Sequence, residues 1–320
     1  MMVKEITAAL QLSQVLDDTY PLWGEGLSRR AYGAWNRAQG LTSWGRRRLS
    51  LVGLVRDGRV VTSAKRYVFD ATAEGKPLKV LGIGAVFTAE AFRGQGLAEQ
   101  LLEAMCEDGR ATGCDVALLF STIGMDYYAR LGFTAVARTV VTLDVPRNRL
   151  GAPATLVRAA ESADLPVLAE ISVQYGQDAS LALSRSADLI EFGVTRRRLL
   201  AGLGPSGLRS VEFFVSEEGR KAVAYVVISR GSGGVSDVFL EECGDRDPSG
   251  ARVGAMLEVL AAREPAHEDR TLKAWWPETF RPPQIKIIGQ AAAPEAMMAR
   301  SLTGRSPQYT QAVFWQTDVF

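Results

Sequence analysis

The chain has 320 residues, of which 47% are hydrophobic, and its 37 lysines and arginines nearly balance its 36 aspartates and glutamates. This balance argues against a nucleic-acid or membrane-surface binder, because both classes usually carry a basic excess. No apolar run approaches the ~18 residues of a membrane span, so we expect no membrane partner. At about 150 residues per domain, the length predicts about two domains.

Histidine and cysteine usage excludes several kinds of catalytic site. The single histidine, His267, cannot form a two-histidine zinc motif, and no G-x-S-x-G sequence accompanies it. We therefore expect no metal site and an exposed His267. Cys106, Cys114 and Cys243 form no CxxC pair, which favours reduced thiols in a cytoplasmic protein. The first residues, MMVKEITAALQLSQ, lack the layout of a secretion signal.

The first half predicts a sheet with a helix packed on it. Residues 50–56 and 59–69 read as strands joined by the two-residue hairpin signal Asp57-Gly58. Residues 78–88 predict a third antiparallel strand, and apolar residues from Leu97 onward recur at helical spacing until residues 109–113. Further along, the pattern predicts a buried strand, a short helix and another strand, at residues 115–120, 125–133 and 136–145.

The second half repeats this pattern in a weaker form. The run VPRNRLGAP, residues 145–153, predicts a boundary between domains 1–145 and 146–320. Beyond it the sequence predicts a strand, a loop and a helix, then a hairpin, then another helix, at residues 155–172, 211–231 and 249–262. Aligning the last helix with the first-half helix places Ala251 at the position of Gly96. The second half is therefore interpreted as a degenerate copy that lacks the glycine-rich turn.

A glycine-rich run stands where the third strand meets the helix. The start of a helix leaves about four amides unpaired and carries roughly half a positive charge. Glycine contributes no Cβ and allows positive φ, so such a turn suits a phosphate or pyrophosphate. A tight turn that serves only packing is the alternative interpretation. The run consists of Arg93, which could add a charged donor, and of Gly94, Gln95, Gly96, Leu97 and Ala98.

The R-x-x-G-x-A run, preceded by GAVFT and followed by YYARLGF at residues 127–133, resembles the signature of the GNAT acyl-CoA N-acyltransferases. The resemblance covers most of residues 45–140. It implies an α/β (α+β) GNAT fold, in which helices flank a central mixed, mostly antiparallel twisted sheet. A degenerate GNAT-like domain would follow it.

The same resemblance implies acetyl-CoA as the co-substrate. In that family the turn holds the coenzyme A pyrophosphate, and the strand before it aligns the pantetheine and the thioester. We therefore expect Arg93–Ala98 to bind the pyrophosphate, and Val86, Phe87 and Thr88 to line the rest. Ser121 and Thr122 follow the next strand, where they either touch the coenzyme or cap a turn.

Acyl transfer to an amine needs a neutral amine, donors for an oxyanion and an acid for the departing thiolate. The resemblance implies that Tyr128 protonates the thiolate, and we expect Tyr127 to pack in the core. Amides near Val86 and Phe87 are candidates for the oxyanion, at a bulge that the family carries.

Gly82 and Gly84, just before that bulge, are typical of a strand that bends or is closely approached by another segment. Ordinary packing against the following helix is the alternative explanation for both.

The general base is expected to be a carboxylate, because no histidine is suitably placed. The terminal carboxylate of Phe320 is the first candidate, since FWQTDVF ends in apolar residues that suggest an anchored tail. A solvated tail is the alternative. Asp318 is the second candidate, and Glu90 is expected to be merely solvated.

Within the superfamily, the chain most resembles the enhanced-intracellular-survival acetyltransferases and the yeast-type lysine N-acetyltransferases. In the former, two GNAT domains follow each other and the C-terminal carboxylate reaches the active site. At 320 residues we expect no sterol-carrier-like domain of the kind that they carry, so the resemblance alone does not assign this role to Phe320.

Three further groups of residues could have a functional role, and for each we also give a purely structural explanation. Lys65 and Tyr67 share a strand face that we expect to be solvated, although a basic group in an acceptor cleft would favour an acceptor with a carboxylate. Trp275 and Trp276 either pack between domains or wall a cleft. A charged loop is predicted for the acidic residues Glu241, Glu242, Asp245 and Asp247.

The sequence therefore predicts a cytoplasmic N-acetyltransferase that moves an acetyl group directly from acetyl-CoA to a primary amine of a small molecule or peptide. A catalytically inactive acyl-CoA-binding sensor is the alternative. A nucleotide-binding regulator would need a ribose or base motif that we do not find. The acceptor, the acyl length and the choice between a monomer and a homo-oligomer stay open, as does any ligand of the second domain.

Overall fold

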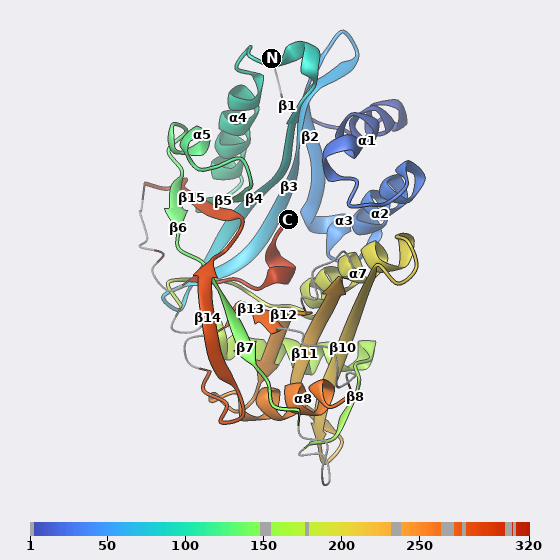
Figure 1. Cartoon of the computed structure of the whole chain (residues 1–320). Coiled ribbons are helices and arrows are strands. Elements are labelled where there is room, and N and C mark those ends of the chain that lie inside the picture. Colours follow the sequence, from blue (N-terminus) through green and yellow to red (C-terminus); the bar gives the residue numbers. More distant parts are fainter. Residues whose placement is uncertain are drawn as a thin grey trace.

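A computed structural model describes residues 3–147, 155–176, 179–231, 238–263, 272–276, 280–304, 309 and 312–320. Within these ranges the chain forms two twisted sheets, one above the other, and each sheet is flanked by helices (Figure 1). This arrangement matches the predicted mixture of sheets and covering helices. His267 and most of the predicted boundary segment lie outside the described residues.

The first sheet is mostly antiparallel, and its main path runs β1-β2-β3-β4-β5-β15-β6. Only β4 and β5 pair in parallel on this path. The hairpin turn between β2 and β3 has φ of 49° at Asp57 and 78° at Gly58, as the sequence predicts. The strands are β1 (Val3–Glu5), β2 (Leu49–Arg56), β3 (Arg59–Ala73), β4 (Lys76–Thr88), β5 (Val116–Ser121), β6 (Thr134–Val136) and β15 (Ala296–Ser301), with β9 (Leu181–Leu183) and β16 (Ala312–Val313) at the side.

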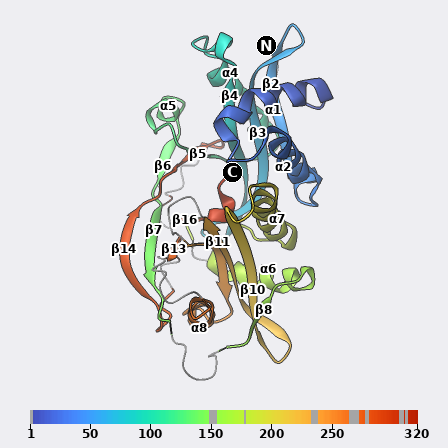
Figure 2. The ribbon, with the colours of Figure 1, turned by 45° about the vertical axis from the view of Figure 1, so that its right-hand side comes forward.

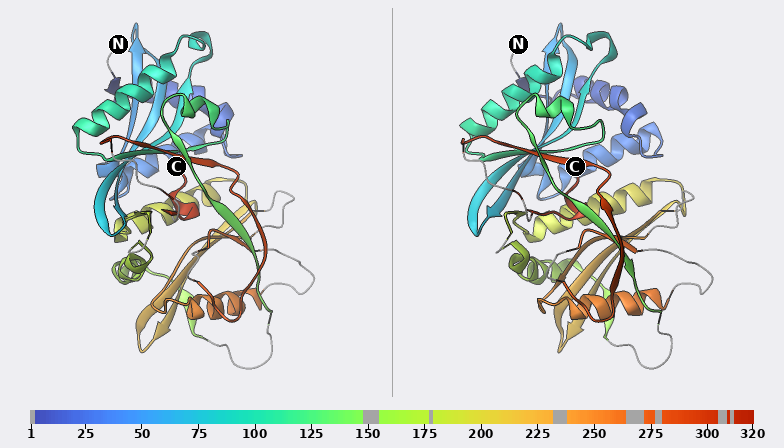
Figure 3. Two further views of the ribbon diagram at one scale, coloured as in Figure 1. Left: turned by 90° about the vertical axis from the view of Figure 1, so that its left-hand side faces the viewer. Right: turned by 60° about the vertical axis from the view of Figure 1, so that its left-hand side comes forward.

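Helices cover both faces of the first sheet (Figure 3). On one face, α4 (Leu97–Ala111) buries Leu97, Leu101 and Met105 against the sheet, which confirms the helix expected from their spacing. The short η1 (Glu90–Phe92) precedes α4, and α5 (Asp126–Ala129) lies near it. The other face carries α1 (Ala9–Trp23), α2 (Arg29–Leu41) and α3 (Gly45–Arg48).

The second sheet runs β14-β7-β13-β12-β11-β10-β8. Its strands are β7 (Thr139–Asp144), β8 (Val157–Ala159), β10 (Arg209–Glu218), β11 (Lys221–Gly231), β12 (Val238–Asp245), β13 (Leu272–Ala274) and β14 (Lys286–Ala292). One face packs on α8 (Ala251–Ala261), and the other packs on α6 (Leu165–Val173) and α7 (Ala187–Leu203) (Figure 2). The remaining turns are η2 (Ser162–Asp164), η3 (Gln174–Gly176) and η4 (Gln316–Asp318). Among the helices in the described ranges, none is long and apolar enough to cross a membrane.

The two sheets exchange strands across the predicted domain boundary. β7, from the first half, pairs with β13 and β14 in the second sheet. β15, from the second half, lies between β5 and β6 in the first sheet. The boundary between residues 145 and 146 stays a prediction about the chain, and both sheets draw strands from each side of it.

The charged loop predicted for the acidic residues of the second half is wrong for its first three members. Glu241, Glu242 and Asp245 belong to β12 and are at most 4% exposed. A buried carboxylate is tolerated only with partners. Tyr225 and Thr317 donate to Glu242 at 2.8 and 2.6 Å.

Candidate active site

The turn before α4 leaves backbone amides open. Gly94 and Gly96 have φ of 75° and 70°, a region that glycine adopts without strain, and a Cβ on either would meet nothing within 4 Å. Within the described residues, no hydrogen bond takes up the amides of Leu97, Ala98 and Glu99. Three free donors at a helix N-terminus suit an anion such as a pyrophosphate.

A bulge in β4 follows the two upstream glycines. Lys65 of β3 pairs with Gly84 and Ser63 pairs with Phe87, so the register shifts between them. Ala85, inside the bulge, has a positive φ of 50°. β4 pairs with β5 from Val80 to Ile83, and within the described residues the bulged part that follows has no strand partner on that side. This frees backbone groups at the level of Val86, where the sequence predicts the thioester.

The last residue of the sequence, Phe320, packs on this part of β4. Its ring centroid lies 4.7 Å from that of Tyr67 and 5.1 Å from that of Phe120. A Cβ on Gly82 would come within 2.8 Å of the Phe320 ring, and one on Gly84 within 3.1 Å of its main-chain carbon and oxygen. The close approach that the glycines predict is therefore confirmed: the rings of Phe69 and Phe320 approach Gly82, and the main chain of Phe320 approaches Gly84, rather than the following helix.

Tyr128 lies in α5 and packs in the same core cluster as the buried residues of α4. Its side chain is 7% exposed, and its ring contacts those of Tyr127 and Phe133 at centroid distances of 5.0 and 6.1 Å. Burial raises the pKa of Tyr128, so its hydroxyl keeps its proton at neutral pH. Tyr127, expected to pack in the core, is half-buried and packs against the same core cluster, with Arg130 over its ring.

The sequence profile described as the acetyltransferase (GNAT) domain matches residues 25–136. This span contains the turn, the β4 bulge and Tyr128. Residues 25–136 match a GNAT domain, and this part of the chain is called the GNAT domain below. No curated protein matches the chain in sequence.

Solved structures share the fold along nearly the whole chain. A GCN5-related N-acetyltransferase from Kribbella flavida superposes with a TM-score of 0.68 at 19% identity, over 93% of this chain and 70% of that one. Eis1 from Mycobacterium abscessus gives 0.60 at 14% identity, over 95% and 74%. A tandem GNAT protein from the clavulanic acid biosynthesis pathway gives 0.53 at 13% identity, over 95% and 99%. At these identities the likeness establishes the fold.

Ser121, Thr122 and Arg93 are also predicted to contact the coenzyme, and each has different surroundings in the structure. The Ser121 hydroxyl donates to the Gly124 carbonyl at 2.8 Å, so it caps the turn after β5, while Thr122 is exposed. The Arg93 guanidinium donates to the Thr88 carbonyl at 3.2 Å. The Arg93 side chain also lines a neighbouring cavity.

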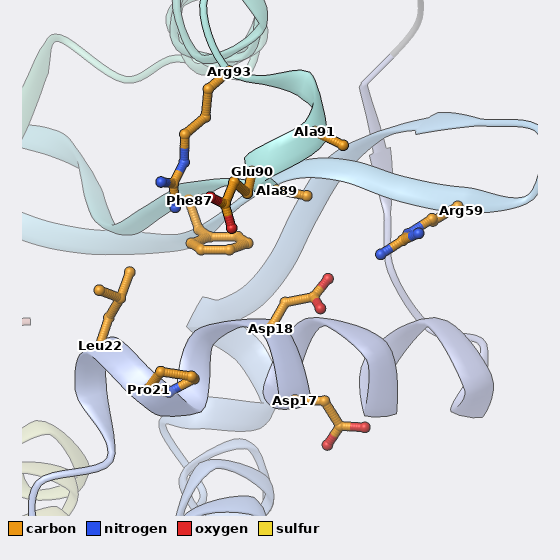
Figure 4. Close-up of a pocket in the computed structure, with 10 residues that line it drawn as sticks. All are labelled: Asp17, Asp18, Pro21, Leu22, Arg59, Phe87, Ala89, Glu90, Ala91 and Arg93. Carbon is orange, nitrogen blue, oxygen red and sulfur yellow. The ribbon is translucent and has the colours of Figure 1, made fainter.

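That cavity, of about 650 Å³, lies between α1 and the segment from β4 to η1. Figure 4 shows Arg93 and Glu90 pointing toward it beside the ring of Phe87. The Arg93 side chain therefore points toward α1 in this structure, and its contact with the pyrophosphate stays a prediction. The walls are Asp17, Asp18, Pro21, Leu22, Arg59, Phe87, Ala89, Glu90, Ala91 and Arg93.

Lys65 and Tyr67 share the face of β3 on which Phe320 packs, and the expectation that this face is solvated is wrong, because Tyr67 is 1% exposed and Lys65 is half-buried. Its Nζ lies 5.6 Å from the ring centroid of Trp35, a contact typical of a cation over an aromatic ring. Burial, and the charge of Arg196, lower the pKa of Lys65 to about 7.

Asp318, the second candidate base, is committed to another contact. Its carboxylate accepts from Arg185 at 2.6 Å and from the Trp315 amide at 2.8 Å, and it is 4% exposed. Burial raises the Asp318 pKa, and Arg185 opposes that rise. A carboxylate held in this way does not reach an acceptor amine.

The second half has closed the turn that the GNAT domain keeps open. Gly250 precedes α8 with φ of 73°, so it is Gly250, and not Ala251, that corresponds to Gly96. A Cβ on Gly250 would lie 2.8 Å from the Phe280 ring. The buried Asp245 carboxylate accepts the amides of Arg252 and Val253 at 2.7 and 3.1 Å. An internal anion thus occupies the helix start where a phosphate would bind.

No group of His, Cys, Asp and Glu residues that could hold a metal ion occurs in the part of the chain that the structure describes.

Proposed function

We propose that the protein transfers an acetyl group from acetyl-CoA directly to a primary amine of a small molecule or peptide. The GNAT domain supports acyl transfer, and the open amides before α4 support a pyrophosphate-bearing donor. The bulged, unpaired part of β4 supports a thioester placed beside Val86. Buried, unpaired Cys106, Cys114 and Cys243 support a cytoplasmic location.

The residues divide the chemistry between them. The amides from Gly94 to Glu99 would hold the pyrophosphate, and the amides near Val86 and Phe87 would stabilise the oxyanion. Tyr128 would give its proton to the coenzyme A thiolate as the carbon–sulfur bond breaks. The Phe320 carboxylate would take the proton that the attacking amine loses, because an ordinary amine with a pKa near ~10.4 is charged at neutral pH.

The observation that carries this proposal is the position of Phe320. Its main chain lies over Gly84, next to the bulge of β4, and its ring is held among Tyr67, Phe69 and Phe120. An anchored carboxylate beside the thioester position is suited to act as a base, whereas Asp318 points into a buried ion pair.

The test is a thiol-release assay with acetyl-CoA across amino acids, polyamines, aminoglycosides and peptide N-termini. We expect at least one class to release coenzyme A. Tyr128→Phe should lower kcat by about 10²- to 10⁴-fold, the usual contribution of a positioned acid. Tyr127→Phe, one residue away, is the matched control and should leave kcat within about twofold.

Two outcomes would count against the proposal. Acetyl-CoA binding by calorimetry without thiol release for any amine would favour an acyl-CoA sensor. Full activity of Tyr128→Phe would remove Tyr128 from the reaction. One glycine added after Phe320 should also lower kcat, because it moves the carboxylate.

A further inference from the structure

The tail of the chain returns from the second half to the GNAT domain. Figure 1 shows the last segment emerging beside α7 and ending against β3 and β4. Trp315, Thr317 and Asp318 are at most 5% exposed, so the tail is enclosed before it reaches Phe320. Whatever fixes this segment also fixes the position of the terminal carboxylate.

Arginines of the second half bind each residue from 316 to 319. Arg196 of α7 donates from Nη2 to the carbonyl of Thr317 at 3.0 Å and to the carbonyl of Val319. Arg197 donates to the Gln316 carbonyl at 2.7 Å. Arg185, just before α7, donates to the carboxylate of Asp318 at 2.6 Å and to the hydroxyl of Thr317 at 3.2 Å. Charge-assisted bonds of this kind are about twice as strong as neutral ones.

Arg185 and Arg196 are buried, whereas the Arg197 side chain is 21% exposed. The side chains of Arg185, Glu242 and Asp318 are 5%, 1% and 2% exposed. Arg185 pairs with Glu242 at 3.2 Å, and Arg197 pairs with Glu241 at 3.1 Å. Among the described residues, no ion pair joins the Phe320 carboxylate to these arginines.

Arg196 acts closest to the proposed base. It donates to the carbonyl of Val319, the residue directly before Phe320, and its guanidinium charge lies near the Tyr67 hydroxyl. The Tyr67 ring in turn contacts the ring of Phe320. Both contacts limit the rotations that would swing the carboxylate away from the bulge.

We propose that Arg185, Arg196 and Arg197 form a clamp by which the second half positions the Phe320 carboxylate in the GNAT site. They are positioning residues, because they bind the tail and not the reacting atoms. This inference rests on the proposed role of Phe320. It also explains why a half with a closed phosphate turn retains α7 and β12 with buried charges. A misplacement of about 1 Å can cost about 10²-fold in rate, so the clamp is expected to act on kcat.

The experiment compares Arg196→Leu with Arg198→Leu, an exposed neighbour on the same helix. Arg196→Leu should lower kcat by about 10²-fold and leave KM for acetyl-CoA within about twofold, because the turn before α4 is untouched. Arg198→Leu should change neither. Arg196→Lys keeps the charge and donors and should recover part of kcat. Arg197→Gln, at a partly exposed position, gives a milder variant if Arg196→Leu fails to fold.

A double-variant cycle separates positioning from general damage. A chain that ends at Val319 should lose about as much kcat as Arg196→Leu, and the two changes together should lose no more than either alone. Multiplied losses would overturn the proposal, because Arg196 would then act independently of Phe320. Unchanged kcat in Arg196→Leu would overturn it as well.

Hydrogen exchange of the tail amides tests the clamp independently of enzymatic activity. The amides of Asp318 and Val319 bond to the carbonyls of Trp315 and Gln316 at 3.0 and 3.3 Å. In Arg196→Leu they should exchange faster, while in Arg198→Leu they should keep the native rate. Native exchange in Arg196→Leu would overturn the clamp. Fast exchange in a protein that acetylates no amine would support the clamp and refute only the proposed function.

Discussion

At the level of the residue, Gly84 leaves the space beside β4 that the main chain of Phe320 occupies. A Cβ there would lie 3.1 Å from the main-chain carbon and oxygen of Phe320, which is closer than nearly all such contacts. We expect Gly84→Ala to displace the carboxylate and lower kcat on the order of 10²-fold, with acetyl-CoA binding kept. Steady-state kinetics and binding calorimetry would measure the two effects.

The matched control is Gly40→Ala in α2, where a Cβ meets nothing within 4 Å. Alanine in a helix should raise the free energy of unfolding by about 0.5–1 kcal/mol and leave kcat unchanged. If Gly84→Ala behaved like Gly40→Ala, Phe320 would not depend on the open space above β4.

The lowered pKa of Lys65 predicts that the free energy of unfolding depends on pH. Burial and the charge of Arg196 lower its pKa to about 7 in the folded protein, from 10.5 for the free group. Between these values the unfolded chain binds the additional proton, so the free energy of unfolding increases as pH rises through this window. Lys65→Met removes the free-energy cost of deprotonating or burying a charged lysine. It should be more stable than the native chain near neutral pH, and the gain should shrink towards pH ~10.

Denaturant midpoints across this pH range would measure the effect, with the exposed Lys76→Met as control. A gain from Lys65→Met that did not change with pH would show that packing, and not charge, is the cause.

At the level of the element, α4 and α8 begin with the same left-handed glycine and differ in what covers it. Gly96→Ala should strain the turn, which costs about 1–3 kcal/mol, and weaken acetyl-CoA binding because the amides shift. Gly250→Ala should destabilise the fold through its 2.8 Å contact with Phe280 and leave acetyl-CoA affinity unchanged. Thermal unfolding with and without acetyl-CoA would separate the two. An equal loss of acetyl-CoA affinity in Gly96→Ala and in Gly250→Ala would contradict an anion site confined to the start of α4.

The elements also show what could be predicted from sequence. The hairpin at Asp57-Gly58 and the start of α4 at Leu97 follow from neighbours a few residues away, so local rules predict them. The position of Met298, beside Leu119 and Ala135, depends on pairing between distant segments that no local pattern encodes. Sequence reasoning did not assign α1, α2 or α7.

In the candidate site, too, some features could be predicted from local sequence and others depend on the fold. Gly82 and Gly84 predicted a close approach, and the apolar tail predicted an anchored Phe320, yet only the fold brings the two together. Arg196 was missed because its partners are main-chain carbonyls, which leave no trace in the sequence of the tail. The run of three consecutive arginines at 196–198, between apolar residues of α7, was the available signal.

At the level of the whole molecule, the exchange of β7 and β15 makes the two halves interdependent. Without residues 146–320, the GNAT sheet would lose β15 from between β5 and β6, and with it the tail that carries Phe320. An interior gap of this kind exposes unpaired strand edges, which favour aggregation. The unit that folds is therefore expected to be the pair of halves.

We thus expect residues 1–145 expressed alone to aggregate, or to show no rise in thermal midpoint with acetyl-CoA, although they contain the whole turn before α4. Co-expression with residues 146–320 should restore a one-to-one complex and that rise, because β15 can then pair with β5 and β6. Size-exclusion chromatography and thermal shift would measure both, with the intact chain as control. A monomeric 1–145 fragment that acetyl-CoA stabilises as strongly as the intact chain would show that β15 and the tail are dispensable for the fold.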